Sequence, residues 1–180
     1  MSDVVPDTKD WTWVLRERCP ECGLDAGTVP LPVLATGLRA AADPWRAALS
    51  RSDAGRRPVA GVWSPLEYGA HVRDVLRVFR ERLALVLADD GARFPDWDQD
   101  AAAVAGDYAH QVPGEVADDL AAGASALADQ VDALSPAELP RRGLRSDGSA
   151  FTVTTLLQYL WHDVVHHLHD VGVPLDEARR

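Results

Sequence analysis

Apolar residues recur every three or four positions through most of this chain, which is the spacing of amphipathic helices. The stretches that carry this spacing are 32–49, 64–89, 113–134 and 152–172. No stretch sustains the strict alternation of a half-buried strand. The pattern therefore predicts an all-α protein, a four-helix bundle over 30–180, preceded by an irregular N-terminal arm over 1–29.

The second helix has the clearest start signal. Ser64 can cap it, Pro65 suits the first helical position, and Glu67 completes a capping box. Pro44 falls inside the first helical stretch, where it is expected to kink or split the helix. The apolar stripe of the second helix begins at Tyr68, and the pattern predicts that the helix runs to about residue 89.

The later helices also have recognisable ends. Ser135 and Pro136 end the third helix. Thr152 or Thr154 caps the fourth, which is expected to end at Gly172 with a proline just beyond it.

Two connecting segments carry polar chemistry. The linker from Gly91 to Gly106 holds Trp97 among several carboxylates, which indicates either a functional loop or a solvated acidic loop with one anchoring tryptophan. The segment from Pro140 to Ala150 is predicted to be a basic loop, and its Arg145 either meets an anionic part of a substrate or is a solvated charge.

Composition narrows the class of protein. The chain has 180 residues, is 47% hydrophobic and has a formal net charge of −10, so it can bury a core and is not expected to bind nucleic acid or an anionic membrane. No apolar run approaches the roughly 20 residues that span a bilayer. Residues 1–10 lack the basic and apolar regions of a signal peptide, so a cytoplasmic location is expected.

The two cysteines of the chain, Cys19 and Cys22, form a Cys-x-x-Cys pair followed by a glycine. In a reducing compartment such a pair binds a metal or acts in redox chemistry more often than it forms a structural disulfide. A structural zinc site needs four ligands, and the chain offers no second cysteine pair. The pair is therefore a possible second metal or redox site, or a simple turn with free thiols.

The fourth helical stretch holds four of the six histidines, and it contains two ligand pairs with four-residue spacing, His162 with His166 and Asp163 with His167. By helical phase, His167 lies about 50° and Asp163 about 90° from the centre of the apolar face. His162 and His166 lie nearly opposite that face, and these two histidines together with His169 are expected to be solvated.

A third ligand has to come from elsewhere, because a catalytic metal commonly has three protein ligands and one open position. The two remaining histidines are His71 and His110. His71 lies at the edge of the apolar stripe of the second helix, where partial burial is expected. His110 lies in a polar stretch and is not expected to bind metal.

These residues carry a resemblance. The Trp-Ser-Pro-Leu-Glu-Tyr-Gly-Ala-His run that ends at His71, followed by a late helix with the pattern His-His-Leu-x-x-Val around His167, resembles the DinB-like superfamily, which includes mycothiol-dependent maleylpyruvate isomerases and bacillithiol transferases. The resemblance covers roughly residues 30–172. It implies a four-helix bundle, often dimeric, that binds one divalent metal ion, for which we expect zinc or else nickel.

The resemblance implies three metal ligands: His71 from the second helix and two residues four apart on the fourth. Aligning the histidine pattern places these two at Asp163 and His167, where the mycothiol branch has a carboxylate and a histidine. Aspartate is shorter than the glutamate of that branch. Shifting the match by one residue gives His162 and His166 instead.

The resemblance also implies an activity. A bound metal would lower the pKa of a small thiol, with mycothiol as cosubstrate, for transfer to an electrophile. Tyr68, Trp97 and Arg145 are possible substrate-binding residues. Alternatives are a hydrolase that uses Glu67 or Asp74 as general base, or a non-catalytic metal-binding or thiol-sensing protein that works through its cysteines. The expected partners are a small thiol or electrophile and a second copy in a homodimer.

Overall fold

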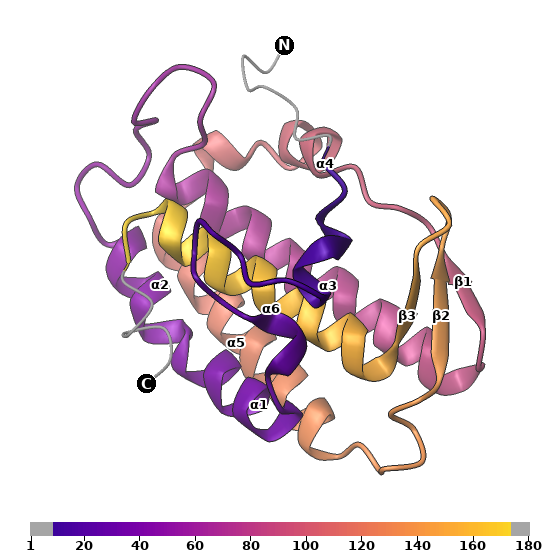
Figure 1. Cartoon of the computed structure of the whole chain (residues 1–180). Coiled ribbons are helices and arrows are strands. Elements are labelled where there is room, and N and C mark those ends of the chain that lie inside the picture. The colour runs from indigo at the N-terminus through magenta and orange to yellow at the C-terminus, as the bar shows by residue number, and fades with distance from the viewer. Residues whose placement is uncertain (1–8, 174–180) are drawn as a thin grey trace.

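The computed structural model describes residues 9–173, and its helices follow the predicted stretches closely (Figure 1). The first stretch is split into α1 (Leu31–Ala40) and α2 (Ala42–Leu49). Pro44 lies in the first turn of α2, where its missing N–H costs no helical hydrogen bond. The expected break near this proline is therefore confirmed, and the break itself falls at Ala41.

The three long helices are α3 (Pro65–Ala88), α5 (Pro113–Asp132) and α6 (Val153–Asp170). The predicted capping box of α3 is present: Ser64 Oγ accepts from the Glu67 amide at 3.2 Å, and the Glu67 carboxylate accepts from the Ser64 amide at 2.8 Å. Thr152 caps α6, and Gly172 has φ of +78°, the left-handed conformation that ends a helix. The proline expected beyond it lies outside the described residues.

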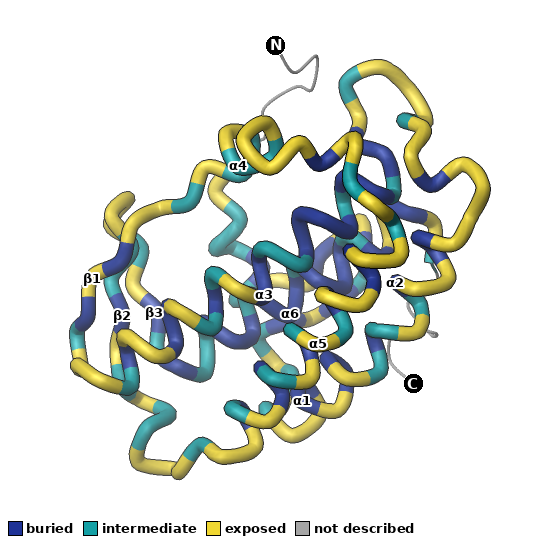
Figure 2. Tube along the Cα trace, turned by 180° about the vertical axis from the view of Figure 1, so that it is seen from behind, coloured by how far each residue is buried: buried dark blue, intermediate teal, exposed yellow. Residues whose placement is uncertain are grey.

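These helices form the bundle. α5 packs against α1, α2 and α3, while α6 packs against α1 and α3. The faces that they turn toward one another are buried (Figure 2). The expected four-helix bundle is therefore confirmed, with α1 and α2 together filling one of its four positions. None of the helices in residues 9–173 combines the length and the apolar character that a membrane-spanning segment needs.

The two polar connections fold further than expected. The acidic linker contains strand β1 (Ala92–Phe94) and helix α4 (Gln99–Ala105), and the basic loop is a hairpin of β2 (Arg142–Arg145) and β3 (Ala150–Thr152). β2 is central, parallel to β1 and antiparallel to β3, with Leu144 opposite Arg93 and Ala150. The expectation of no strand was wrong here, because strands of three or four residues are too short to show alternation.

The N-terminal arm lies across the face of α6 that points away from the bundle core (Figure 1). It contains two short 3-10 helices, η1 (Trp11–Leu15) and η2 (Ala26–Thr28), and both contact α6. Val14 of the arm is fully buried and so anchors the arm on the body. Gln158 of α6 donates from Nε2 to the carbonyls of Gly27 and Val29, at 3.0 and 3.1 Å. The arm therefore makes α6 a central helix, buried on both sides.

Candidate metal centres

The bundle brings together His71 from the second turn of α3 and Asp163 and His167 from adjacent turns of α6; we call these three residues the triad. Asp163 Oδ1 lies 3.5 Å from His71 Nε2 and 3.5 Å from His167 Nε2. One ligand atom from each residue lies within 4.8 Å of the others. The capping box fixes where α3 begins, and the four-residue spacing on α6 places its two members on one face.

The triad has the burial and charge of a ligand set. His71 is 1% exposed, and its two ring nitrogens and Asp163 Oδ1 are buried without a hydrogen-bond partner. Burial lowers the pKa of His71, so its imidazole is neutral near pH 7, as a metal ligand must be. Burial alone would raise the pKa of Asp163, but His167 and His71 hold it below its usual range. The carboxylate is therefore ionised.

These residues fit a divalent ion. A tetrahedral ion with bonds of about 2.1 Å separates its ligand atoms by about 3.4 Å, close to the two separations measured here. His167 Nδ1 contacts Asp170 Oδ2 at 2.8 Å, the outer carboxylate contact that commonly orients a metal-binding histidine. Three donors leave one coordination position for a substrate.

Aromatic rings enclose the triad. Trp97 stacks on His71 with ring centroids 5.4 Å apart, and Trp63 approaches the same ring at 5.3 Å. Tyr68 lies 5.0 Å from the His167 ring. This enclosure limits access of water and strengthens electrostatic interactions at the triad.

Two cavities meet at the triad. The first has a volume of about 290 Å³ and includes His167 in its wall; the second has a volume of about 580 Å³ and includes His71. Asp163 lines both. The other residues that line both cavities are Lys9, Trp11, Gln99, Asp100 and Tyr159.

A second group of potential ligands lies on the neighbouring face of α6. Cys19, Cys22, His162 and His166, which we call the cysteine–histidine cluster, have ligand atoms within 4.8 Å of one another. The expectation that His162 and His166 are solvated was wrong, since they are 4% and 7% exposed. The arm covers the face on which they lie. Helical phase could not indicate this, because it reports only where the apolar residues of α6 itself point.

Three residues predicted to bind substrate have different surroundings. Tyr68 lines the first cavity, and Trp97 and Arg145 line the second. Arg145 donates to Asp147 at 2.7 Å and lies over the Phe151 ring, so this arginine also supports the hairpin.

The residues proposed as general bases for hydrolysis are already engaged. Glu67 is 3% exposed and accepts hydrogen bonds from Arg57 as well as from the capping box. Asp74 accepts from Tyr108 Oη and from Arg73. Neither carboxylate lines a cavity at the triad.

The other two histidines are peripheral. His169 is exposed, as expected from its phase. His110 is also exposed and contacts Asp107 at 2.7 Å, away from both groups of ligands.

Some residues at the triad were missed from the sequence. Trp11 lines both cavities at the triad because of the fold of the arm, which no local signal indicates, and Asp100, one of the linker carboxylates, lines them because α4 places it there. Tyr159 precedes Asp163 by four residues on α6, a spacing that would have placed it on the same face. Burial raises the pKa of Tyr159, so its hydroxyl keeps its proton.

Comparison with known proteins agrees with this architecture. The family model of the DinB superfamily matches residues 36–171. A solved structure, YfiT from Bacillus subtilis, superposes with a TM-score of 0.68 at 16% identity, over 77% of this chain and 83% of that one. YfiT is described as a probable metal-dependent hydrolase with an unusual four-helix bundle topology. No curated protein matches the chain. Since the family model spans three quarters of the sequence, from α1 to the end of α6, the chain belongs to the DinB superfamily.

Proposed function

We propose that this protein is a divalent-metal-dependent transferase that joins a low-molecular-weight thiol to an electrophile at the triad. The observation that carries the proposal is the meeting of two cavities at three convergent, metal-compatible side chains. The volumes of the two cavities suit small molecules, and a site with two compartments suits a reaction of two substrates.

The residues of the chain would perform three tasks. His71, Asp163 and His167 would hold one divalent ion, zinc or else nickel, which when bound lowers the pKa of a thiol in the open position. With one carboxylate among the ligands, the loaded site keeps a positive charge that attracts a thiolate. Tyr159 lines both cavities and its hydroxyl stays protonated, so that it can donate a hydrogen bond to the electrophile.

The lining of the larger cavity favours a polar thiol as the substrate. Its wall includes Arg82, Arg145 and Asp98 beside the aromatic Trp97, a mixture that can bind hydroxyl and amide groups. Mycothiol, the cosubstrate implied by the resemblance, has this polar chemistry. A cytoplasmic location, with its reducing thiol pool, and a homodimeric assembly complete the proposal.

Metal-dependent hydrolysis is the second candidate, and Asp100 is the observation in its favour. Asp100 lines both cavities, where its carboxylate could accept a proton from water. The substitution Asp100→Asn would abolish hydrolysis and spare thiol transfer, whereas Asp119→Asn on the exposed face of α5 would affect neither.

The test is a thiol-transfer assay on the full-length, zinc-loaded protein with mycothiol and monochlorobimane, following formation of the thioether. We expect a thiol-dependent rate that His71→Ala lowers by more than the roughly 10–100-fold cost of losing an outer ligand partner, because it removes a ligand. His71→Ala should also bind one metal equivalent less than wild type.

The matched control is His110→Ala, which removes an exposed histidine far from the triad and should keep both the rate and the metal. Equal metal content in the two variants would contradict the ligand assignment. Release of chloride from monochlorobimane in the absence of thiol, with water as the nucleophile, would favour the hydrolase.

A further inference from the structure

We propose that the cysteine–histidine cluster is a closed zinc site that fastens the N-terminal arm to α6. It has two thiol and two imidazole ligands, the set and number found in structural zinc sites. Cys19 Sγ lies 3.7 Å from His166 Nδ1. Tetrahedral zinc, with bonds of about 2.3 Å to sulfur and 2.0–2.1 Å to nitrogen, would separate these atoms by about 3.6 Å.

The arm forms a turn suited to present both thiols. The Gly23 amide donates to the Cys19 carbonyl at 2.9 Å, and the Cys19 amide donates to the Leu24 carbonyl at 2.9 Å. Gly23 has φ of +72°, which a residue with a side chain rarely adopts. The sequence therefore closes a tight loop around the position where the two sulfurs meet.

The histidines on α6 are arranged to complete this site. His162 and His166 lie one turn apart, and His162 Nε2 is buried without a hydrogen-bond partner. His166 directs Nδ1 toward Cys19 and Nε2 toward Glu21, whose Oε2 lies at 3.4 Å. A metal-binding histidine commonly gives its other ring N–H to a carboxylate in this way. Here that carboxylate belongs to the Cys-x-x-Cys loop itself.

This site differs from the triad in its charge when loaded and in its burial. Two thiolates neutralise a divalent ion, so the loaded cluster can be buried without a net charge, and four protein ligands leave no position open. Cys19 and Cys22 are 0% and 2% exposed. A thiol that senses oxidants or exchanges disulfides is accessible, so burial favours a structural role over a redox one.

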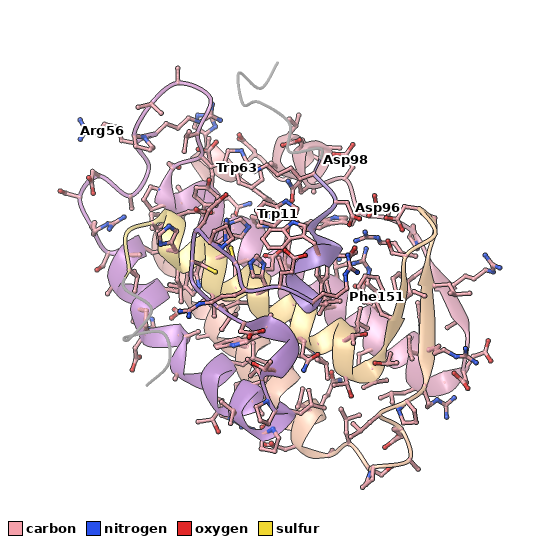
Figure 3. All side chains as sticks on the ribbon, viewed as in Figure 1. Trp11, Arg56, Trp63, Asp96, Asp98 and Phe151 are labelled. Carbon is pink, nitrogen blue, oxygen red and sulfur yellow. The ribbon has the colours of Figure 1, made fainter. Side chains whose placement is uncertain are left out.

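The zinc site would also shape the cavities, a consequence that rests on the proposed function. Trp11 packs on the rings of His162 and His166, with centroids 5.7 and 5.0 Å apart, and lies in front of α6 (Figure 3). Trp11 and Lys9 line both cavities at the triad, and Glu21 lines the first. Fastening the loop at Cys19 would therefore hold one wall of the active site in place.

The test uses the full-length protein without a histidine tag, substituted with Co²⁺, and needs no activity. We expect a thiolate-to-cobalt charge-transfer absorption, with the intensity of tetrahedral cobalt, in wild type and in His71→Ala. Cys22→Ser should lack it and bind one metal equivalent less. In zinc-loaded wild type, both thiols should resist a thiol reagent until a chelator removes the metal.

Several results would overturn the zinc site. They are a cobalt protein without thiolate absorption, thiols that react while all metal is retained, or a Cys19–Cys22 disulfide in freshly purified protein. The wild-type measurements decide the matter even when Cys22→Ser does not fold. Failure of the proposed function would appear separately, as thiolate absorption together with unchanged metal content in His71→Ala.

The fastening role has its own readout. Arg16 and Arg18 are exposed in the arm, so trypsin should cleave there at least about tenfold faster after zinc is removed than before. Cleavage at equal rates would contradict the role of the metal in holding the arm.

Discussion

Consecutive residues on α6 belong to different groups of potential metal ligands. His162 and His166 lie toward the arm, while Asp163 and His167 lie toward α3. Adjacent helical residues are about 100° apart, and residues four apart nearly coincide, so two pairs shifted by one residue serve two neighbouring faces. The position of α6 must therefore be held accurately, and Trp161, directly before these ligands, contributes to it by packing on α1.

The contact between Trp161 and Gly37 of α1 gives a prediction at this scale. A Cβ on Gly37 would lie 2.6 Å from Trp161 Cη2, so Gly37→Ala should lower the free energy of unfolding by about 1–3 kcal/mol through overpacking. Gly123→Ala is the matched control in α5, where the new Cβ meets Leu76 at an ordinary 3.7 Å and should stabilise the helix by about 0.4–1 kcal/mol. Urea unfolding measures the change in the free energy of unfolding for both variants. Equal changes in the two variants would refute the packing argument.

At the scale of elements, the start of α3 determines where His71 lies. The capping box is reinforced by Arg57, which donates from Nε to the Glu67 carboxylate at 3.0 and 3.1 Å. Burial alone would raise the pKa of Glu67, but these bonds and those from Ser64 hold it below its usual value. The loop before α3 and the helix itself are thus joined by one buried, ionised carboxylate.

This carboxylate gives a prediction about pH. Because the pKa of Glu67 is lower in the folded state, its contribution to stability is complete above the unfolded value of about 4.3 and is lost as the pH falls toward the folded value. Glu67→Gln keeps the capping geometry without the charge, so its melting temperature should fall less than that of wild type between pH 6 and pH 3. Glu115→Gln, exposed in the first turn of α5, should behave as wild type. If the melting temperature fell equally with pH in all three proteins, the charge of Glu67 would not contribute to stability.

At the scale of the whole molecule, the arm and the bundle share α6 as their common surface. The contacts of Gln158 and the cysteine–histidine cluster lie along one side of the helix, and those of the triad lie along another. The two proposed metals would therefore differ in effect. A metal at the triad would join α3 to α6, which already pack together, whereas a metal at the cluster would join the arm to the body.

Removal of metal should reveal this difference. A chelator added to the zinc-loaded protein should release zinc in two phases, first from the open triad and then from the closed cluster. The melting temperature should fall mainly in the second phase, because a tightly bound ligand of the folded state contributes more to stability. A metallochromic indicator measures the release of zinc, and calorimetry measures the melting temperature. If the melting temperature instead fell fully in the first phase of zinc release, the stabilising role would belong to the triad and not to the cysteine–histidine cluster.

Local sequence patterns determined the helices. The capping box at Ser64, the break near Pro44 and the 3.6-residue period of α6 depend on residues within one or two turns, so each could be predicted without the fold. The helical period of α6 also placed Asp163 and His167 on one side of that helix, and the period of α3 placed His71 at the edge of its apolar stripe. These patterns favoured the three residues as neighbours of one another. A pattern within one helix does indicate which of its residues face the core.

The surroundings of the helices were decided by tertiary structure. Cys19 and His166 are 147 positions apart, and only the path of the arm across α6 brings them together. Helical phase therefore predicted solvent where the structure has a buried face. The short sheet and the cavity wall formed by Trp11 likewise depend on segments packed from a distance. Local periodicity follows from the geometry of one helix, whereas burial also depends on which other part of the chain covers it.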